Sequence, residues 1–177
     1  TKLIRSDCSI TFLIDLEVVH STKHVPVRAA YSPLPTMAMA GETLPTCLLR
    51  HAERTPGKVF LEVWGEEEGV SLQVTFAELA DCMLSGAQWL RAATGLQRGD
   101  YCAMLAHNSV GYLSISLGAM ALGAISLNLN WRQPEATTRT LLEDLAPRVL
   151  VASKPFKGTA TAMHKALGIK MVLIESI

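Results

Sequence analysis

The sequence predicts an α/β fold in which βαβ units build a mostly parallel sheet with helices on both faces, preceded by a β-hairpin. Four apolar stretches begin at Tyr101, Ala124, Arg148 and Lys170, at intervals of 23, 24 and 22 residues. Each interval has room for one helix, and strands that are separated by helices pair in parallel. The stretches are continuously apolar, which is typical of strands covered on both faces.

The segment before these stretches predicts a hairpin. Residues Val59–Trp64 and 70–76 alternate apolar and polar side chains, and they flank a run of three glutamates and a glycine at 66–69. Alternating segments around a short polar turn are typical of two antiparallel strands. A short amphipathic helix is expected to begin at Leu44 and to end at Pro56.

Local signals predict the helices as well. Thr75 and Glu78 form the pattern of a capping box, and apolar residues at helical spacing follow them as far as Gly95, which favours a helix end. Ser109 is expected to cap the next helix, which Gly123 ends. The remaining helices are expected at 134–145 and 159–167.

The chain carries no Asp, Glu, Lys or Arg between Asp100 and Arg132. A membrane span at about 109–130 is one interpretation, because Tyr112 and Trp131 would lie near its two ends. No cluster of basic residues marks one side of the stretch, however. The regular strand spacing instead divides it into a buried strand, a helix and a second buried strand, and we favour this interpretation.

Composition excludes some classes of protein. The chain has 16 basic and 16 acidic residues, so a basic surface for nucleic acid is not expected. The four cysteines form no CxxC or metal-knuckle motif. Glu17, His20 and His24 would share one face of a helix, but Pro26 follows at once and the HExxH order is absent, so no metal site is expected there.

Polar side chains follow two of the predicted strands. His107 comes directly after the strand at 101–106, which is where α/β enzymes place residues that contact ligands. Arg132 follows the next strand, after Asn128 and Asn130. A purely structural role is the alternative for all of them, with the asparagines and Arg132 fixing the turn into the next helix.

The first 40 residues differ from the rest. They contain an apolar run that Asp15 and Glu17 interrupt, which is unlike a secretory signal. We interpret residues 1–40 as read-through, a linker or a weak targeting segment, and residues 41–177 as an incomplete N-terminal subdomain. Both ends of the sequence have the character of cut ends.

Five motifs occur in an order that resembles one enzyme family. They are TFAEL (75–79), RGD (98–100), AMLAHNS (103–109), ALGAISLNLNWR (121–132) and LLEDLAPRVLVAS (141–153). Together they resemble the N-terminal part of the adenylate-forming (AMP-binding) superfamily, which includes the acyl-CoA synthetases. The resemblance covers residues 44–177. Ala121 and Asn128 depart from the family pattern, which has Lys and Pro at these positions.

The resemblance implies a parent enzyme that is an ATP-dependent acid–CoA ligase of the fatty-acyl or aryl-acyl type. A carboxylic acid, ATP and Mg²⁺ would give an acyl-adenylate, from which coenzyme A would displace AMP. The family's phosphate-binding loop, magnesium ligand and catalytic lysine come later in the polypeptide. No catalytic, cofactor-binding or metal-binding residue is therefore assigned in this chain, and the chain alone is expected to be inactive.

Two alternatives remain open at this point. The chain could be a short non-catalytic binding or regulatory module of the same fold, or a membrane protein that spans at about 109–130. We expect an intracellular location in the cytoplasm, a peroxisome or a plastid. The expected partners are the acid substrate, ATP and coenzyme A, without nucleic acid or membrane.

Overall fold

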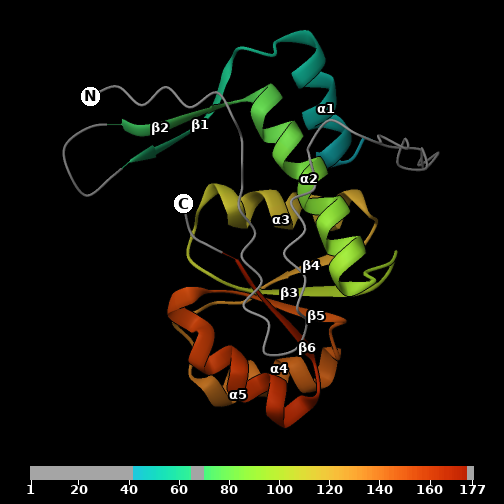
Figure 1. Ribbon diagram of the computed structural model, residues 1–177, viewed down its shortest axis with the longest axis vertical. Coiled ribbons are helices and arrows are strands. Elements are labelled where there is room, and N and C mark those ends of the chain that lie inside the picture. Colours follow the sequence, from blue (N-terminus) through green and yellow to red (C-terminus); the bar gives the residue numbers. More distant parts are fainter. Residues whose placement is uncertain (1–41, 65–69, 175–177) are drawn as a thin grey trace.

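A computed structural model describes residues 42–64 and 70–174 of the chain. The segment 1–40, the candidate metal ligands Glu17, His20 and His24, and the glutamates at 66–68 lie outside the described residues. The helices and strands of the described part are labelled in Figure 1.

The first described elements are a helix and the expected hairpin. Helix α1 (Leu44–Arg54) begins after Thr43, whose side chain accepts a hydrogen bond from the backbone of Thr46. Strands β1 (Val59–Trp64) and β2 (Val70–Thr75) pair antiparallel. The hairpin projects from the body of the molecule next to the start of α2 (Figure 1).

Helix α2 (Phe76–Thr94) begins and ends where its sequence signals predict. The Thr75 Oγ1 accepts from the Glu78 amide at 3.3 Å, and the Glu78 carboxylate accepts from the Thr75 amide at 2.8 Å. These reciprocal bonds satisfy two amides that would otherwise lack helical partners. Gly95 ends the helix with φ of 68°, a left-handed conformation that favours glycine.

The predicted parallel sheet is present and has four strands in the described part. These are β3 (Tyr101–Leu105), β4 (Ile125–Asn128), β5 (Val149–Ser153) and β6 (Lys170–Ile174). Their order is β4-β3-β5-β6, and all three pairings are parallel. Helices α3 (Val110–Ala121), α4 (Glu135–Leu145) and α5 (Lys157–Leu167) connect them in turn.

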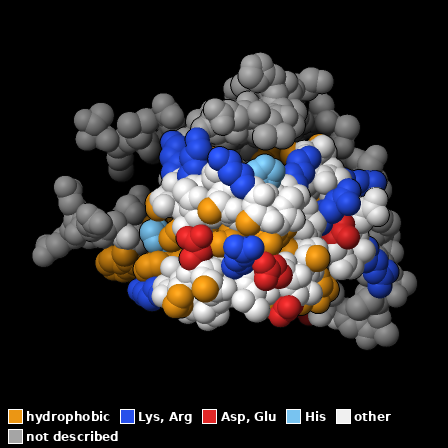
Figure 2. Space-filling view, turned by 90° about the horizontal axis from the view of Figure 1, so that it is seen from below, with side chains coloured by type: hydrophobic (Ala, Val, Ile, Leu, Met, Phe, Trp, Pro, Cys, Tyr) orange, Lys and Arg blue, Asp and Glu red, His pale blue; other side chains and the backbone are white. Residues whose placement is uncertain are grey.

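Helices cover both faces of the sheet, as predicted. Alternate strand residues face two separate apolar clusters: Met104 and Val151 pack with Ile115 of α3, whereas Leu105 and Leu150 pack with the other cluster, on the α4 and α5 side. Helix α3 lies above the sheet, with α4 and α5 below it (Figure 1). The outer face of α4 and α5 mixes acidic and basic side chains (Figure 2), as is ordinary for a solvated surface.

The long uncharged stretch is divided between β3, α3 and β4. Helix α3 is buried on both sides, because Ile115 and Ala119 face the sheet while Val110 and Leu117 face α1 and α2. A helix that is apolar all round is expected in such a position. Within the described residues, no helix is long and apolar enough to cross a membrane.

The start of α5 differs from the sequence-based expectation. Helix α5 begins at Lys157 instead of residue 159, and a 3₁₀ turn at Lys154–Phe156 leads into it. Pro155 lies in that turn, near its start, where its missing N–H costs nothing. Gly158 lies within the first turn of α5.

Candidate functional site at the carboxyl edge of the sheet

The candidate site lies where the direction of the strand order reverses. From β3 the chain passes through α3 to β4 on one side, whereas from β5 it passes through α5 to β6 on the other. The loops after β3 and β5 therefore leave opposite faces of the sheet. In open α/β sheets, ligands bind at the carboxyl ends of the strands at such a point.

Three aromatic side chains from three different loops meet at this edge. The ring of His107, after β3, lies 4.7 Å from the ring of Trp131, after β4, and 4.8 Å from the ring of Phe156, after β5. Both contacts are edge-to-face, which is a favourable geometry for aromatic pairs. Trp131 and Phe156 are 6.0 Å apart. We call these three residues the aromatic cluster.

A cation lies over this cluster. The Arg132 guanidinium carbon is 4.3 Å from the centre of the Trp131 ring, within the range of a cation–π interaction. The Arg132 amide donates to the side-chain oxygen of Asn130 at 3.0 Å. Asn130 therefore fixes this turn, as the structural interpretation predicted.

Asn128 has a different role from the expected one. Its side-chain oxygen accepts a hydrogen bond from Ser126 at 3.1 Å, and Ser126 in turn pairs with the buried Ser116 of α3 at 2.8 Å. This chain of polar groups runs from the interior of the α3 layer to the exposed end of β4. It fixes the end of β4 against α3, and among the hydrogen bonds of the described residues none joins Asn128 to the turn at Arg132.

A buried hydroxyl at the end of β5 and a half-buried phenol at the start of α3 lie near this edge of the sheet. Ser153 ends β5 fully buried, and its hydroxyl has no hydrogen-bond partner among the described residues. Burial raises the pKa of the Tyr112 phenol in the first turn of α3. Tyr112 packs against the apolar cluster on the α3 side of the sheet.

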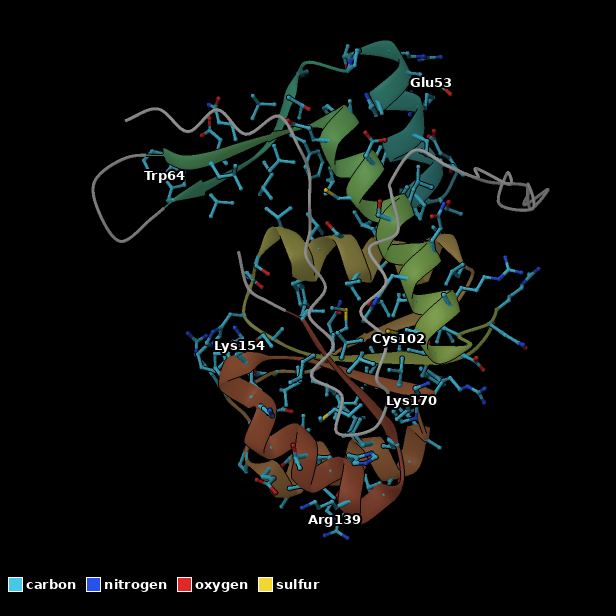
Figure 3. All side chains as sticks on the ribbon, viewed as in Figure 1. Glu53, Trp64, Cys102, Arg139, Lys154 and Lys170 are labelled. Carbon is cyan, nitrogen blue, oxygen red and sulfur yellow. The ribbon has the colours of Figure 1, made fainter. Side chains whose placement is uncertain are left out.

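The surface of the site is suited to binding. His107 and Trp131 are exposed, and Phe156 is half-buried, so the cluster presents ring surface to solvent beside one guanidinium. Lys154 lies at the same edge of the molecule (Figure 3). Flat ring surface beside cations favours planar or anionic groups. No group of three metal-ligating side chains occurs in the described ranges.

The sequence indicated part of this site. His107, Asn130 and Arg132 are candidates because they follow predicted strands. The structure brings His107 and Arg132 together, since both contact Trp131. Trp131 enters the sequence-based expectations as part of the motif at 121–132 and as one end of a possible membrane span, and Phe156 does not enter them. Their position directly after β4 and β5 is the signal that could have found them.

Comparisons with known proteins agree with this architecture. A family model described as "AMP-binding enzyme" matches residues 48–175. An indoleacetate–CoA ligase of Aromatoleum aromaticum is 31% identical over 118 residues, which are 67% of this chain and 22% of that protein. A 2-succinylbenzoate–CoA ligase of Oceanobacillus iheyensis is 28% identical over 124 residues, 70% of this chain and 25% of that protein.

Solved structures share the fold. An anthranilate CoA ligase in complex with anthranoyl-AMP superposes with a TM-score of 0.65 at 20% identity, covering 73% of this chain and 24% of that one. An O-succinylbenzoate coenzyme A synthetase of Bacillus subtilis, in complex with ATP and magnesium, gives 0.62 at 23% identity, covering 71% and 32%. The chain spans no more than a quarter of the two curated relatives. The chain belongs to the AMP-binding enzyme family and corresponds to an N-terminal portion of such an enzyme.

Proposed function

We propose that the protein containing this chain is an acid–CoA ligase that works through an acyl-adenylate. The observation that carries the proposal is the unbroken family match over residues 48–175, together with a parallel sheet that is shared with solved CoA ligases. The carboxylate would attack the α-phosphate of ATP and release pyrophosphate. The thiolate of coenzyme A would then attack the acyl carbon, and AMP would leave.

The two curated relatives described above favour an aromatic acid as the substrate. One is named for indoleacetate and the other for 2-succinylbenzoate, and both acids carry an aromatic ring. A fatty acid is the second substrate class that the family includes. The substrate panel of the test below therefore contains both classes.

This chain would contribute the scaffold of the enzyme. The helices and the parallel sheet fix the loops after β3, β4 and β5 at one edge, and the aromatic cluster joins these loops. ATP chemistry needs a phosphate-binding loop, a Mg²⁺ ligand and a cation for the developing charge. By resemblance these groups lie in later residues, so we propose that residues 1–177 alone do not form an adenylate.

The test is acid-dependent exchange of labelled pyrophosphate into ATP by the full-length protein, followed by the loss of the free thiol of coenzyme A. The panel contains indoleacetate, 2-succinylbenzoate, benzoate, octanoate and palmitate. We expect an aromatic acid to stimulate exchange and then to consume the thiol. If none of the acids of either class stimulates the exchange, the ligase proposal is contradicted and a non-catalytic module is favoured. Exchange by residues 1–177 alone would contradict the scaffold role.

A further inference from the structure

Four exposed basic side chains gather at the amino edge of the parallel sheet, where α2 ends. They lie in the last turn of α2, in the turn before β3, directly before β5 and at the start of β6: Arg91, Arg98, Arg148 and Lys170. We call these four residues the basic patch. Lys170 begins β6 whereas Lys154 follows the end of β5, and the two lie on opposite sides of the sheet in Figure 3. The patch is therefore remote from the candidate site at the carboxyl edge.

Contacts with the end of α2 bring three members of the patch together. The Lys170 ammonium donates to the Ala93 carbonyl in the last turn of α2 at 2.6 Å. A guanidinium nitrogen of Arg148 lies 3.5 Å from the point that a Cβ atom on Gly95 would occupy, and Gly95 ends α2. Arg91 lies four residues before Gly95, on the same face of the helix. The three cations therefore surround the C-terminus of α2.

Arg98 continues the patch and has an exposed isoleucine beside it. The Arg98 stem covers the turn before β4, with its Cγ atom 3.1 Å from the point that a Cβ atom on Gly123 would occupy. The Ile125 amide donates to the Asp100 carbonyl at 2.8 Å, so the start of β4 adjoins the turn that carries Arg98. The Ile125 side chain is 45% exposed. This turn leads into β3, the neighbour of β5, and the patch is therefore continuous.

Acidic residues of the described part do not neutralise the patch. No member forms an ion pair there, since both ion pairs of the described residues lie elsewhere. Asp100, in the adjoining turn, uses its carboxylate to accept from the Gln97 amide at 2.9 Å. The helix end accounts for Lys170, because a cation stabilises the negative C-terminus of a helix. Three guanidinium groups remain that have no acidic partner in this part of the chain.

We propose that the basic patch docks on the surface of an anionic membrane. Basic residues near an anionic bilayer each add to the affinity, and an apolar side chain among them gains by entering the headgroup region. Ile125 supplies that apolar group. It favours a lipid surface over nucleic acid, whose phosphate backbone offers no apolar cover. Such a contact is peripheral and needs no membrane-spanning helix.

The sequence alone predicts no membrane partner, because the chain has equal numbers of acidic and basic residues. The patch exists only where the fold brings four separate segments to one edge. It rests on these contacts and charges, and neither on the family membership nor on ligase activity. Docking at the amino edge would leave the candidate site at the opposite edge open to solvent.

The first test is co-sedimentation of the full-length protein with vesicles, without substrate. Vesicles of phosphatidylcholine alone are compared with vesicles that contain about 30% phosphatidylserine, an anionic lipid. We expect the protein to sediment only with the anionic vesicles. We also expect its release when NaCl is raised from about 0.1 M to about 0.5 M, because salt screens exposed charges. Equal binding to both kinds of vesicle, or no binding to the anionic ones, would overturn the proposal.

The second test assigns the binding to the patch. Arg98→Gln/Arg148→Gln removes two of its cations and keeps Lys170, which stabilises the end of α2. Arg54→Gln/Lys58→Gln is the matched control, because it removes the same charge from exposed residues at and after the end of α1. We expect the first variant to bind anionic vesicles at least about tenfold more weakly and the control to lose less than about threefold. Equal losses would mean that only the overall charge matters, against the proposal.

Two further results keep the test decisive. If Arg98→Gln/Arg148→Gln does not fold, as its melting curve would show, Arg91→Gln takes its place, with Arg54→Gln as its control. An acidic protein is the other class of partner. Retention of the full-length protein on immobilised polyglutamate, without binding to anionic vesicles, would overturn the membrane proposal and assign the patch to an acidic protein.

Discussion

The imidazole of His107 meets the phenyl ring of Phe156 edge to face, with the ring centres 4.8 Å apart. The two residues follow neighbouring strands, β3 and β5, whose loops leave opposite faces of the sheet. The contact therefore joins the two loops across the point where ligands bind in folds of this class. It makes the position of each loop depend on the other.

Energetic coupling between His107 and Phe156 is the first prediction. We expect a double-mutant cycle with His107→Ala and Phe156→Leu to give a coupling free energy of about 0.5–1.5 kcal/mol, the usual range for aromatic pairs. Urea unfolding of the full-length protein measures it. A parallel cycle that pairs Phe156→Leu with Leu44→Ala is the control, and we expect it to be additive. Additivity in both cycles would show that the ring contact contributes no stability.

Gly118 should not tolerate even a methyl group. A Cβ atom there would lie 2.7 Å from the Ala87 backbone nitrogen and 3.0 Å from the Met83 carbonyl oxygen, so α2 and α3 would have to move apart. We expect Gly118→Ala to destabilise the protein by about 1–3 kcal/mol, despite the better helix propensity of alanine. Gly158→Ala in α5 is the control, because nothing lies within 4 Å of its Cβ position. A neutral Gly118→Ala would mean that the helices pack more loosely than described.

The contribution of the α2 capping box to the free energy of unfolding should also be measurable by substitution. Thr75→Ala removes the acceptor for the Glu78 amide, and it also removes the hydroxyl that donates to the Glu78 carboxylate at 2.8 Å. We expect a loss of about 1 kcal/mol in the free energy of unfolding. Thr75→Ser keeps the hydroxyl and should recover most of the loss. If serine and alanine are equivalent, the hydroxyl does not cap the helix.

We expect the protein to lose stability at alkaline pH because the thiol of Cys102 is buried. Burial in the centre of the sheet raises its pKa from 9.0 to about 12, so the folded state keeps a proton that the unfolded state releases. Stability is therefore unaffected below about pH 9 and falls between pH 9 and 12. At pH 10.5 we expect this thiol alone to cost about 2 kcal/mol relative to pH 7.

The check is the difference in unfolding free energy between pH 7 and pH 10.5, measured for the wild type and for Cys102→Ala. The variant should lose less stability across this interval, whatever its stability at pH 7. Part of the decrease in unfolding free energy should remain in Cys102→Ala, because burial also raises the pKa of Tyr112. Tyr112→Phe should remove that part. An equal decrease in the wild type and in Cys102→Ala would show that the thiol has the same pKa in the folded and the unfolded state.

The sequence predicted the elements of this fold better than their arrangement. Strands such as β5 are recognisable because burial on both faces demands an unbroken apolar run, and Gly95 and Ser109 mark helix ends through their own backbone chemistry. The order β4-β3-β5-β6 has no such local signal, since four apolar strands can pair in many ways. The aromatic cluster depends on that order. His107 could be singled out by its place after a strand, but its contact with Phe156 follows only from β3 lying beside β5.

Helix α3 has a consequence for how the molecule unfolds. One of its sides belongs to the layer of α1, α2 and the hairpin, and its other side belongs to the sheet. It has no charged residue, so water is a poor substitute for either neighbour. Neither layer can separate and leave the other intact, because each separation would expose an uncharged and largely apolar side of α3 to water. We therefore expect the two layers to melt in one transition, with amides in α1 and in β3 exchanging their hydrogens through the same opening event.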